Sequence, residues 1–255
     1  MGGAGPGGPW TDPAAGGTER APVAPRLGGY PAASSTPDPP QGLVLNATVL
    51  LLVRHGVTDA TGKRLYGRSA GVHLSDRGRA QAEAVAERLK ALPIRAVISS
   101  PLERCRETAA PIARALGLRV RRERGVLETD MGAWTGRTFG QIRRSGLWSR
   151  ILAMPSSARF PEGESLAEVQ ARTVKALEAI ASRHPKEIVV VVSHGDPIRL
   201  ALAHYAGTHL DLFQRLEVAP GSVSAVTLGG RAPGVLRVND TGDLSDLLPR
   251  GTGRR

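Results

Sequence analysis

The sequence predicts an α/β protein with a mostly parallel central sheet, and two observations lead to this prediction. Uninterrupted apolar runs at Val49 to Val53 and at Ile188 to Val192 are typical of parallel strands that are covered on both faces. From Ala47 onward, such strand patterns alternate with amphipathic helix patterns, as they do in α/β proteins. We therefore expect one sheet with helices packed against it.

The length and composition predict one globular domain with tails. The chain has 255 residues, of which 41% are hydrophobic and 22% are charged. Residues 1–45 are rich in Gly, Pro, Ala and Ser without hydrophobic periodicity, so we expect a disordered tail, a domain over residues 46–240 and a flexible end over residues 241–255. No apolar run approaches the roughly 20 residues of a membrane helix, and no secretory segment opens the chain. We expect a cytoplasmic protein without a membrane partner.

The charge and the cysteine content exclude several classes of protein. One cysteine, Cys105, excludes an internal disulfide and a thiolate metal cluster, and it fits a reducing compartment. The net charge is +11, but the arginines are dispersed, and the nine aromatic residues do not alternate with them as in a platform for nucleic-acid bases. We expect no nucleic-acid partner. The charge favours small anionic substrates, with a merely solvated basic surface as the alternative.

The first half of the domain contains two expected strand-to-helix units. A polar loop over residues 58–74 separates the first strand from a helix that Ser75 caps and Pro93 ends. A second strand covers residues 94–99. Ser100 is then expected to cap a helix that begins at Pro101, because proline is tolerated at the first helical position.

The second half repeats this organisation around a less regular segment. Residues 120–127 are expected to form a short strand, and residues 139–162 a weakly amphipathic and irregular region that could form a lid beside a pocket. Ser165 and Glu168 form a capping box that opens a long helix. The remaining elements expected are the strand at 188–192, a helix that begins at Asp196 and Pro197, and strands at 223–228 and 235–238.

Three strand-to-helix crossings place cations or imidazoles at one edge of the predicted sheet. Arg54 and His55 follow the first strand, Arg104 follows the second, and His194 follows the strand at 188–192. Ligands bind beyond the carboxyl ends of parallel strands. Arginine forks match phosphate oxygens, so the cluster is suited to a tetrahedral dianion. The histidines could alternatively bind metal, but no His-x-His or acidic cluster accompanies them, so we expect no metal.

Five motifs together resemble the histidine phosphatase superfamily, branch 1, which includes cofactor-dependent phosphoglycerate mutases. The resemblance spans about Ala47 to Leu228 and implies a phosphoglycerate mutase-like fold, a three-layer α/β/α sandwich around a mostly parallel sheet. The motifs are LLVRHGVT at 51–58, SSPLERCRETA at 99–109, LETDMGAWTG at 127–136, PEGES at 161–165 and SHGDPIRLAL at 193–202. Each is weak alone, but five in this order form a specific signal.

The resemblance also implies roles for individual residues and no cofactor. His55 would be the nucleophile that accepts the phosphoryl group, and Glu128 would donate a proton to the leaving group. Arg54, Arg104 and His194 would hold the phosphate oxygens. The substrate-binding set that we expect is Arg54, Thr58, Thr61, Arg104, His194 and Gly195.

The chain departs from the common family pattern at two positions beside the expected phosphate site. Many members have Arg-His-Gly-Glu-Thr and then an asparagine three residues later, whereas this chain has Val57 and Thr61 at the glutamate and asparagine positions. Thr61 can still donate one hydrogen bond. The two departures therefore bear on the contacts to phosphate oxygens or on substrate preference, while the four residues around the phosphate are retained and the chemistry is expected to be preserved.

The leading interpretation is a metal-independent phosphomonoester hydrolase that forms a phosphohistidine with a small phosphorylated metabolite. Phosphoglycerate mutase-type phosphoryl transfer and a catalytically silent phospho-ligand-binding protein are the alternatives, although a pure binder would need neither Glu128 nor His55. A homodimer is left open. Trp134, Trp148 and Phe160 are expected either in the pocket wall or in the core.

Overall fold

A computed structural model describes residues 46–242, which form a six-stranded sheet in the order β3-β2-β4-β1-β5-β6. The two expected tails lie outside the described residues, apart from 241 and 242. Within the described part of the chain, no helix combines the length and apolar character that crossing a membrane requires. The strands are β1 (Thr48–Arg54), β2 (Ile94–Ser99), β3 (Val120–Arg122), β4 (Ile188–Ser193), β5 (Val223–Leu228) and β6 (Gly234–Asp240).

The predicted mostly parallel sheet is confirmed. β1 pairs in parallel with β4, β4 with β2, and β2 with β3, whereas β5 and β6 are antiparallel to their neighbours. Every residue of β4 is buried, and only Arg54 at the end of β1 is partly exposed. The continuous apolar runs predicted as doubly covered strands therefore form the centre of the sheet.

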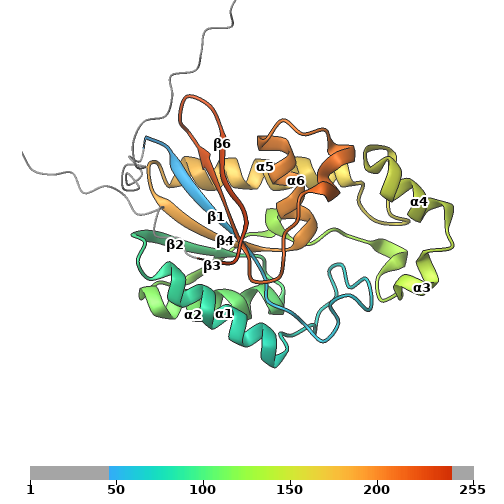
Figure 1. Ribbon diagram of the computed structural model, residues 1–255, viewed down its shortest axis with the longest axis horizontal. Coiled ribbons are helices and arrows are strands. Elements are labelled where there is room, and N and C mark those ends of the chain that lie inside the picture. Colours follow the sequence, from blue (N-terminus) through green and yellow to red (C-terminus); the bar gives the residue numbers. More distant parts are fainter. Residues whose placement is uncertain (1–45, 243–255) are drawn as a thin grey trace, which may run out of the picture. The chain divides into compact units, whose positions relative to one another are not determined.

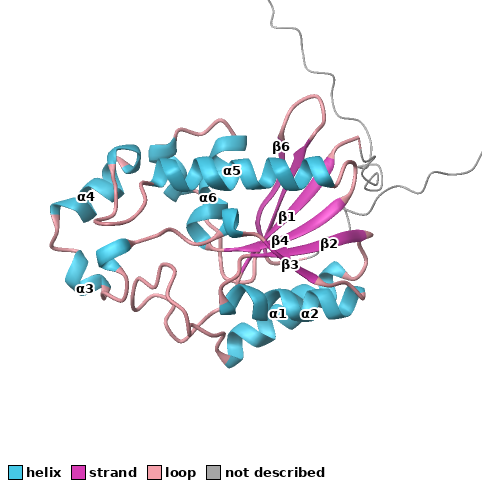
Figure 2. Cartoon of the chain, turned by 180° about the vertical axis from the view of Figure 1, so that it is seen from behind, coloured by secondary structure: helices cyan, strands magenta, loops and turns pink. Residues whose placement is uncertain are grey.

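Helices cover both faces of the sheet, which confirms the three-layer sandwich (Figures 1 and 2). On one face, α1 and α2 pack with Leu51 and Val53 of β1 in one hydrophobic cluster. On the other face, α5 and α6 pack with Leu50 and Leu52. The helices are α1 (Asp76–Leu89), α2 (Glu103–Leu116), α3 (Phe139–Ile142), α4 (Gly146–Ala153), α5 (Leu166–Arg183) and α6 (Gly195–Tyr205), with 3-10 helices at Arg124–Val126, Gly132–Trp134, Pro155–Ser157 and Leu210–Arg215.

Two of the predicted helix starts are confirmed and one is wrong. Ser75 accepts a hydrogen bond from the Gly78 amide, and Ser165 and Glu168 form the capping box that opens α5. The expected cap at Ser100 is absent, and α2 begins at Glu103 without a side-chain cap. The backbone of Ser100 instead extends the sheet, because its amide donates to the Val192 carbonyl at 2.9 Å.

The strand expected over residues 120–127 is also shorter than predicted. β3 ends at Arg122, and the Glu123 carboxylate then accepts from the Gly125 amide at 2.9 Å and caps a 3-10 turn. A local side-chain bond of this kind competes with continuation of the strand. The turn redirects the chain toward Glu128.

The start of α1 packs directly against the turn that follows β1. A Cβ added to Gly78 would lie 2.0 Å from the Val57 carbonyl oxygen, and one added to Gly56 would lie 2.4 Å from the Gly78 carbonyl oxygen. Only glycine allows backbones to approach so closely. This contact fixes the turn that carries His55.

Candidate active site

A cavity of about 450 Å³ lies at the carboxyl edge of the parallel strands. Residues from three separate crossings line it, because Arg54 ends β1, Arg104 lies in the first turn of α2 and Asp196 lies in the first turn of α6. Nearly all of the predicted site residues line the cavity: Arg54, His55, Thr58, Thr61, Arg104, Glu128 and Gly195. His194 does not line it.

His55 is held as a neutral imidazole with one free nitrogen. Its Nδ1 lies 2.7 Å from the Gly56 carbonyl oxygen. Because a carbonyl only accepts, Nδ1 carries the hydrogen and Nε2 keeps its lone pair. Burial, together with the nearby Arg104 and Arg54 cations, lowers the pKa of His55 to about 3. The ring is therefore unprotonated at neutral pH, which is the state that a nucleophilic imidazole requires.

Two guanidiniums beside His55, that of the partly buried Arg54 and that of the buried Arg104, have unused donors. The Nη1 of Arg54 donates to the Val218 carbonyl at 2.5 Å, and the Nη2 of Arg104 donates to the Gly67 carbonyl at 2.8 Å. Among the described residues, Arg54 Nε and Arg104 Nη1 are buried without a hydrogen-bond partner. An unpaired buried donor is costly. An anion in the cavity would supply the missing acceptors.

Glu128 contributes a carboxyl group to the cavity and is largely shielded from solvent. Burial and the neighbouring Asp196 carboxylate raise its pKa to about 7, although the Arg104 and Arg54 cations oppose the shift. Its Oε1 accepts from the Thr129 amide at 2.9 Å. A carboxyl group with such a pKa can donate a proton and later accept one.

His194 lies next to His55 and Glu128 but is fully buried. Its ring centroid is 5.2 Å from that of His55, and its Nδ1 is 3.9 Å from Glu128 Oε2. Its Nε2 lies 2.8 Å from the Ser100 hydroxyl and 3.4 Å from Cys105 Sγ. The predicted cluster is thus brought together, while direct contact of His194 with phosphate oxygens stays a prediction.

The two residues that depart from the family pattern, Val57 and Thr61, lie at different places relative to the cavity. Thr61 accepts from the Thr58 amide at 3.0 Å, and the two hydroxyls are also 3.0 Å apart, so Thr61 closes the loop beside His55. Val57 does not line the cavity, and its amide donates to the Gln81 side chain at 2.9 Å. Of the two substitutions, Thr61 is the one that faces the substrate space.

The outer wall of the cavity is apolar and comes mainly from α3, α4 and the segment after them. Trp148 and Phe160 line the cavity, as one interpretation of the sequence expected. Trp134 lies behind them in the core, with its ring centroid 6.4 Å from Trp148 and 5.7 Å from Phe160. The region expected as a lid therefore forms a wall of the cavity. In Figure 2, α3 and α4 lie away from the sheet.

Sequence reasoning missed several residues of the site. Asp196 was assigned only to a helix start, yet it lines the cavity and raises the pKa of Glu128. Arg64 and Arg199 also line the cavity. Arg64 lies outside the five motifs, and Arg199, although it lies within the motif at 193–202, was given no role. The SHGDP motif could have indicated Asp196, because it places that carboxylate two residues after His194.

The comparisons with known proteins agree with this geometry. The model of the histidine phosphatase superfamily (branch 1) matches residues 50–241. Phosphoserine phosphatase 1 of Hydrogenobacter thermophilus is 32% identical over 200 residues, which cover 78% of this chain and 95% of that protein. The bifunctional protein Rv2228c of Mycobacterium tuberculosis is 37% identical over 201 residues, which cover 77% of this chain but only 55% of that protein.

Two solved structures share the fold over most of the described residues. A mycobacterial glucosyl-3-phosphoglycerate phosphatase superposes with a TM-score of 0.70 and 27% identity, covering 76% of this chain and 100% of that one. YhfR of Bacillus stearothermophilus superposes with a TM-score of 0.71 and 27% identity, covering 79% and 100%. The match to both neighbours extends over their whole length.

Proposed function

The chain belongs to the histidine phosphatase superfamily, and we propose that it hydrolyses phosphate monoesters in two steps through a phosphohistidine at His55. Its family and its phosphatase relatives make it a phosphatase of small phosphorylated metabolites. The observation that carries the two-step proposal is the neutral His55 beside the unpartnered donors of Arg54 and Arg104.

In the first step, Nε2 of His55 attacks the phosphorus atom and the bond to the leaving alcohol breaks. Arg54 Nε and Arg104 Nη1 donate to the phosphoryl oxygens, whose charge must be stabilised in the transition state. Glu128 gives its proton to the departing oxygen. The products are the alcohol, the phosphohistidine and the Glu128 carboxylate.

In the second step, water replaces the alcohol. The Glu128 carboxylate takes one proton from water as the oxygen attacks the phosphohistidine. The bond between phosphorus and Nε2 breaks, inorganic phosphate leaves, and His55 and protonated Glu128 are restored. The raised pKa of Glu128 suits a group that performs both proton transfers near neutral pH.

The need for a metal, the partners and the cellular location are also matters of proposal. We propose that the reaction needs no metal or other cofactor, because the two arginines can supply the positive charge that a metal would provide. We propose a small-molecule partner and neither nucleic acid nor membrane. A cytoplasmic location is supported by the single, buried and unpaired Cys105, which fits a reducing compartment.

One experiment tests the proposal directly. The purified protein is assayed with a panel of phosphate monoesters in the presence of a chelator, with His55→Ala as the blank. We expect phosphate release by the wild type, none above background by His55→Ala, and acid-labile radiolabelled phosphate trapped on the wild type alone. Turnover that survives in His55→Ala, or that requires a divalent metal, would contradict the proposal.

The same assay separates the mutase alternative. A mutase passes the phosphoryl group to a second hydroxyl before water reaches it. Phosphoglycerate isomerisation faster than phosphate release would therefore favour the mutase, and phosphate release alone favours the hydrolase.

A further inference from the structure

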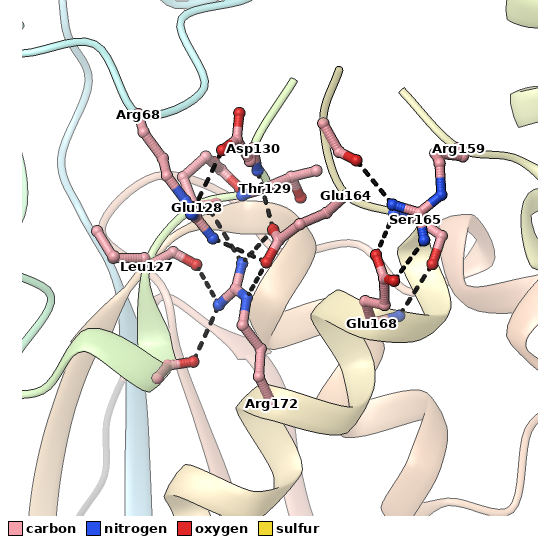
Figure 3. A network of polar contacts seen from close by, with 12 residues as sticks. Arg68, Leu127, Glu128, Thr129, Asp130, Arg159, Glu164, Ser165, Glu168 and Arg172 are labelled. Atoms are coloured by element: carbon pink, nitrogen blue, oxygen red, sulfur yellow. Dashed lines mark hydrogen bonds and ion pairs between the residues drawn. The ribbon is translucent and has the colours of Figure 1, made fainter. Parts of the chain in front are cut away.

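The backbone on both sides of Glu128 is held by guanidinium groups (Figure 3). The Glu128 carbonyl accepts from Arg68 Nε at 2.9 Å and from Arg172 Nη2 at 3.0 Å. The preceding carbonyl, that of Leu127, accepts from Arg172 Nη1 at 2.8 Å. Hydrogen bonds from a charged donor are about twice as strong as neutral ones. The two peptide units that flank the Glu128 Cα are therefore fixed.

Arg172, on α5, uses its complete fork in this arrangement. Its Nε donates to Glu164 Oε1 at 2.7 Å, and its Nη2 also donates to Glu164 Oε2 at 3.0 Å. Its Nη1 donates to the Gly125 carbonyl at 2.9 Å in addition to that of Leu127. All five N–H donors of the guanidinium have acceptors. A lysine has the same charge but cannot reproduce this planar geometry.

Glu164 anchors the fork and ties it to a second arginine. Its Oε2 accepts from the Asp130 amide at 3.0 Å, and its Oε1 lies 2.8 Å from Arg68 Nη2. Burial alone would raise the pKa of Glu164, but the hydrogen bonds from Arg172 and Asp130 and the charge of Arg68 hold it below its usual value. Glu164 therefore stays ionised and keeps both arginines in place.

We propose that Arg172, supported by Glu164 and Arg68, is a positioning residue that aims the Glu128 carboxyl group at the leaving oxygen. This inference rests on the proposed function. A displacement of about 1 Å in a catalytic group reduces rate by roughly 100-fold. Arg172 does not itself line the cavity, and its hydrogen bonds near the site go to the Leu127 and Glu128 carbonyls, so its contact with Glu128 is through the backbone.

The test compares two phosphates that differ in their need for a proton. Phenyl phosphate releases a phenol that must be protonated, whereas 2,4-dinitrophenyl phosphate releases a phenolate that is stable without a proton. kcat/KM reports the steps up to transfer to His55. For Arg172→Lys we expect kcat/KM to fall about 10- to 100-fold with phenyl phosphate and less than about 3-fold with the dinitrophenyl ester.

A matched control distinguishes positioning from simple loss of stability. The Arg88 side chain is 18% exposed, against 21% for Arg172, and it pairs with Asp240 at 2.7 Å on the other side of the sheet. Arg88→Lys should affect both phosphates equally. Equal losses with the two phosphates in Arg172→Lys would overturn the inference.

A second variant covers the case in which Arg172→Lys does not fold. The Arg68 side chain is 32% exposed, and Arg68→Lys removes the Nε donor to the Glu128 carbonyl. We expect the same preference for the dinitrophenyl ester, with a smaller loss; no preference would overturn the inference. If the wild type hydrolyses neither phosphate, the proposed function falls and the inference falls with it.

Discussion

Burial shifts the pKa values of His55 and Glu128, two side chains that line the cavity, in opposite directions. It lowers the pKa of His55 to about 3 and raises that of Glu128 to about 7, because in both cases the neutral form is favoured away from water. Between these two values His55 is unprotonated and Glu128 is protonated. That pair of states is the one that the proposed first chemical step requires.

The activity should therefore decline as pH rises through about 7. kcat/KM reports the ionisation of the free enzyme, and the Glu128 carboxylate formed above about 7 has no proton to give. We expect an alkaline decline with phenyl phosphate, measured as kcat/KM between about pH 5 and 9. Glu128→Gln should lower the rate by about 10²- to 10⁴-fold and should abolish the decline. An unchanged alkaline decline in Glu128→Gln would assign it to another group.

The residues predicted from the sequence share one property. Arg54, His55, Arg104 and His194 lie at the carboxyl ends of buried strands or in the first turn of the helix that follows, so the topology of a parallel sheet is enough to bring them to one edge. Ser100 was misassigned because its hydroxyl binds His194, a partner 94 residues away. Arg68 and Arg172 were missed for a similar reason, since their partners are carbonyls of other segments and a sequence pattern does not reveal those.

At the scale of elements, α1 and the turn after β1 behave as one unit. The close approach of Gly56 and Gly78 leaves no room for a side chain on either residue. Strands and helices with strong hydrophobic patterns were predicted correctly. β3 was predicted too long, because a local bond between Glu123 and the Gly125 amide ends the strand and no periodicity signals that bond.

Gly78→Ala should therefore destabilise the fold. The added Cβ would collide with the Val57 carbonyl, and relief requires a backbone shift in the turn that holds His55. Overpacking of this kind lowers the free energy of unfolding by about 1–3 kcal/mol, which urea denaturation would measure. Gly146→Ala, in α4 with open space around its Cα, should be neutral or slightly stabilising. Equal effects of the two substitutions would refute the steric explanation.

The apolar wall from α3 and α4 should select for the leaving group. Trp148 lines the cavity and packs edge-on against Phe139, with 6.0 Å between ring centroids. Trp148→Ala removes part of an apolar surface worth roughly 1.5–3 kcal/mol for a buried side chain. We expect the KM for phenyl phosphate to rise about 10-fold and that for methyl phosphate to change little. A similar rise for both would mean that Trp148 supports the phosphate site instead.

At the scale of the molecule, the antiparallel end of the sheet supports the catalytic edge. The Asn239 side chain, near the end of β6, accepts from the Ala219 amide at 2.6 Å. The adjacent Val218 carbonyl holds Arg54 Nη1. β6 was expected from the sequence, but its pairing with β5 and its link to Arg54 depend on contacts between distant segments, which hydrophobic patterns do not specify.

Residues 46–242 should therefore be sufficient for folding and catalysis. They contain all six strands of the described sheet and its three hydrophobic clusters, so a chain of these residues alone should match the full chain in kcat/KM and within about 2 °C in Tm. A chain ending at Leu236 loses both Asn239 and the Asp240 carboxylate that pairs with Arg88 at 2.7 Å. Because the first loss releases the segment that holds Arg54, we expect this shorter chain to lose activity as well as stability. Thermal unfolding and phosphate release are measured on both chains. Full activity in the chain that ends at Leu236 would show that the end of β6 does not support Arg54.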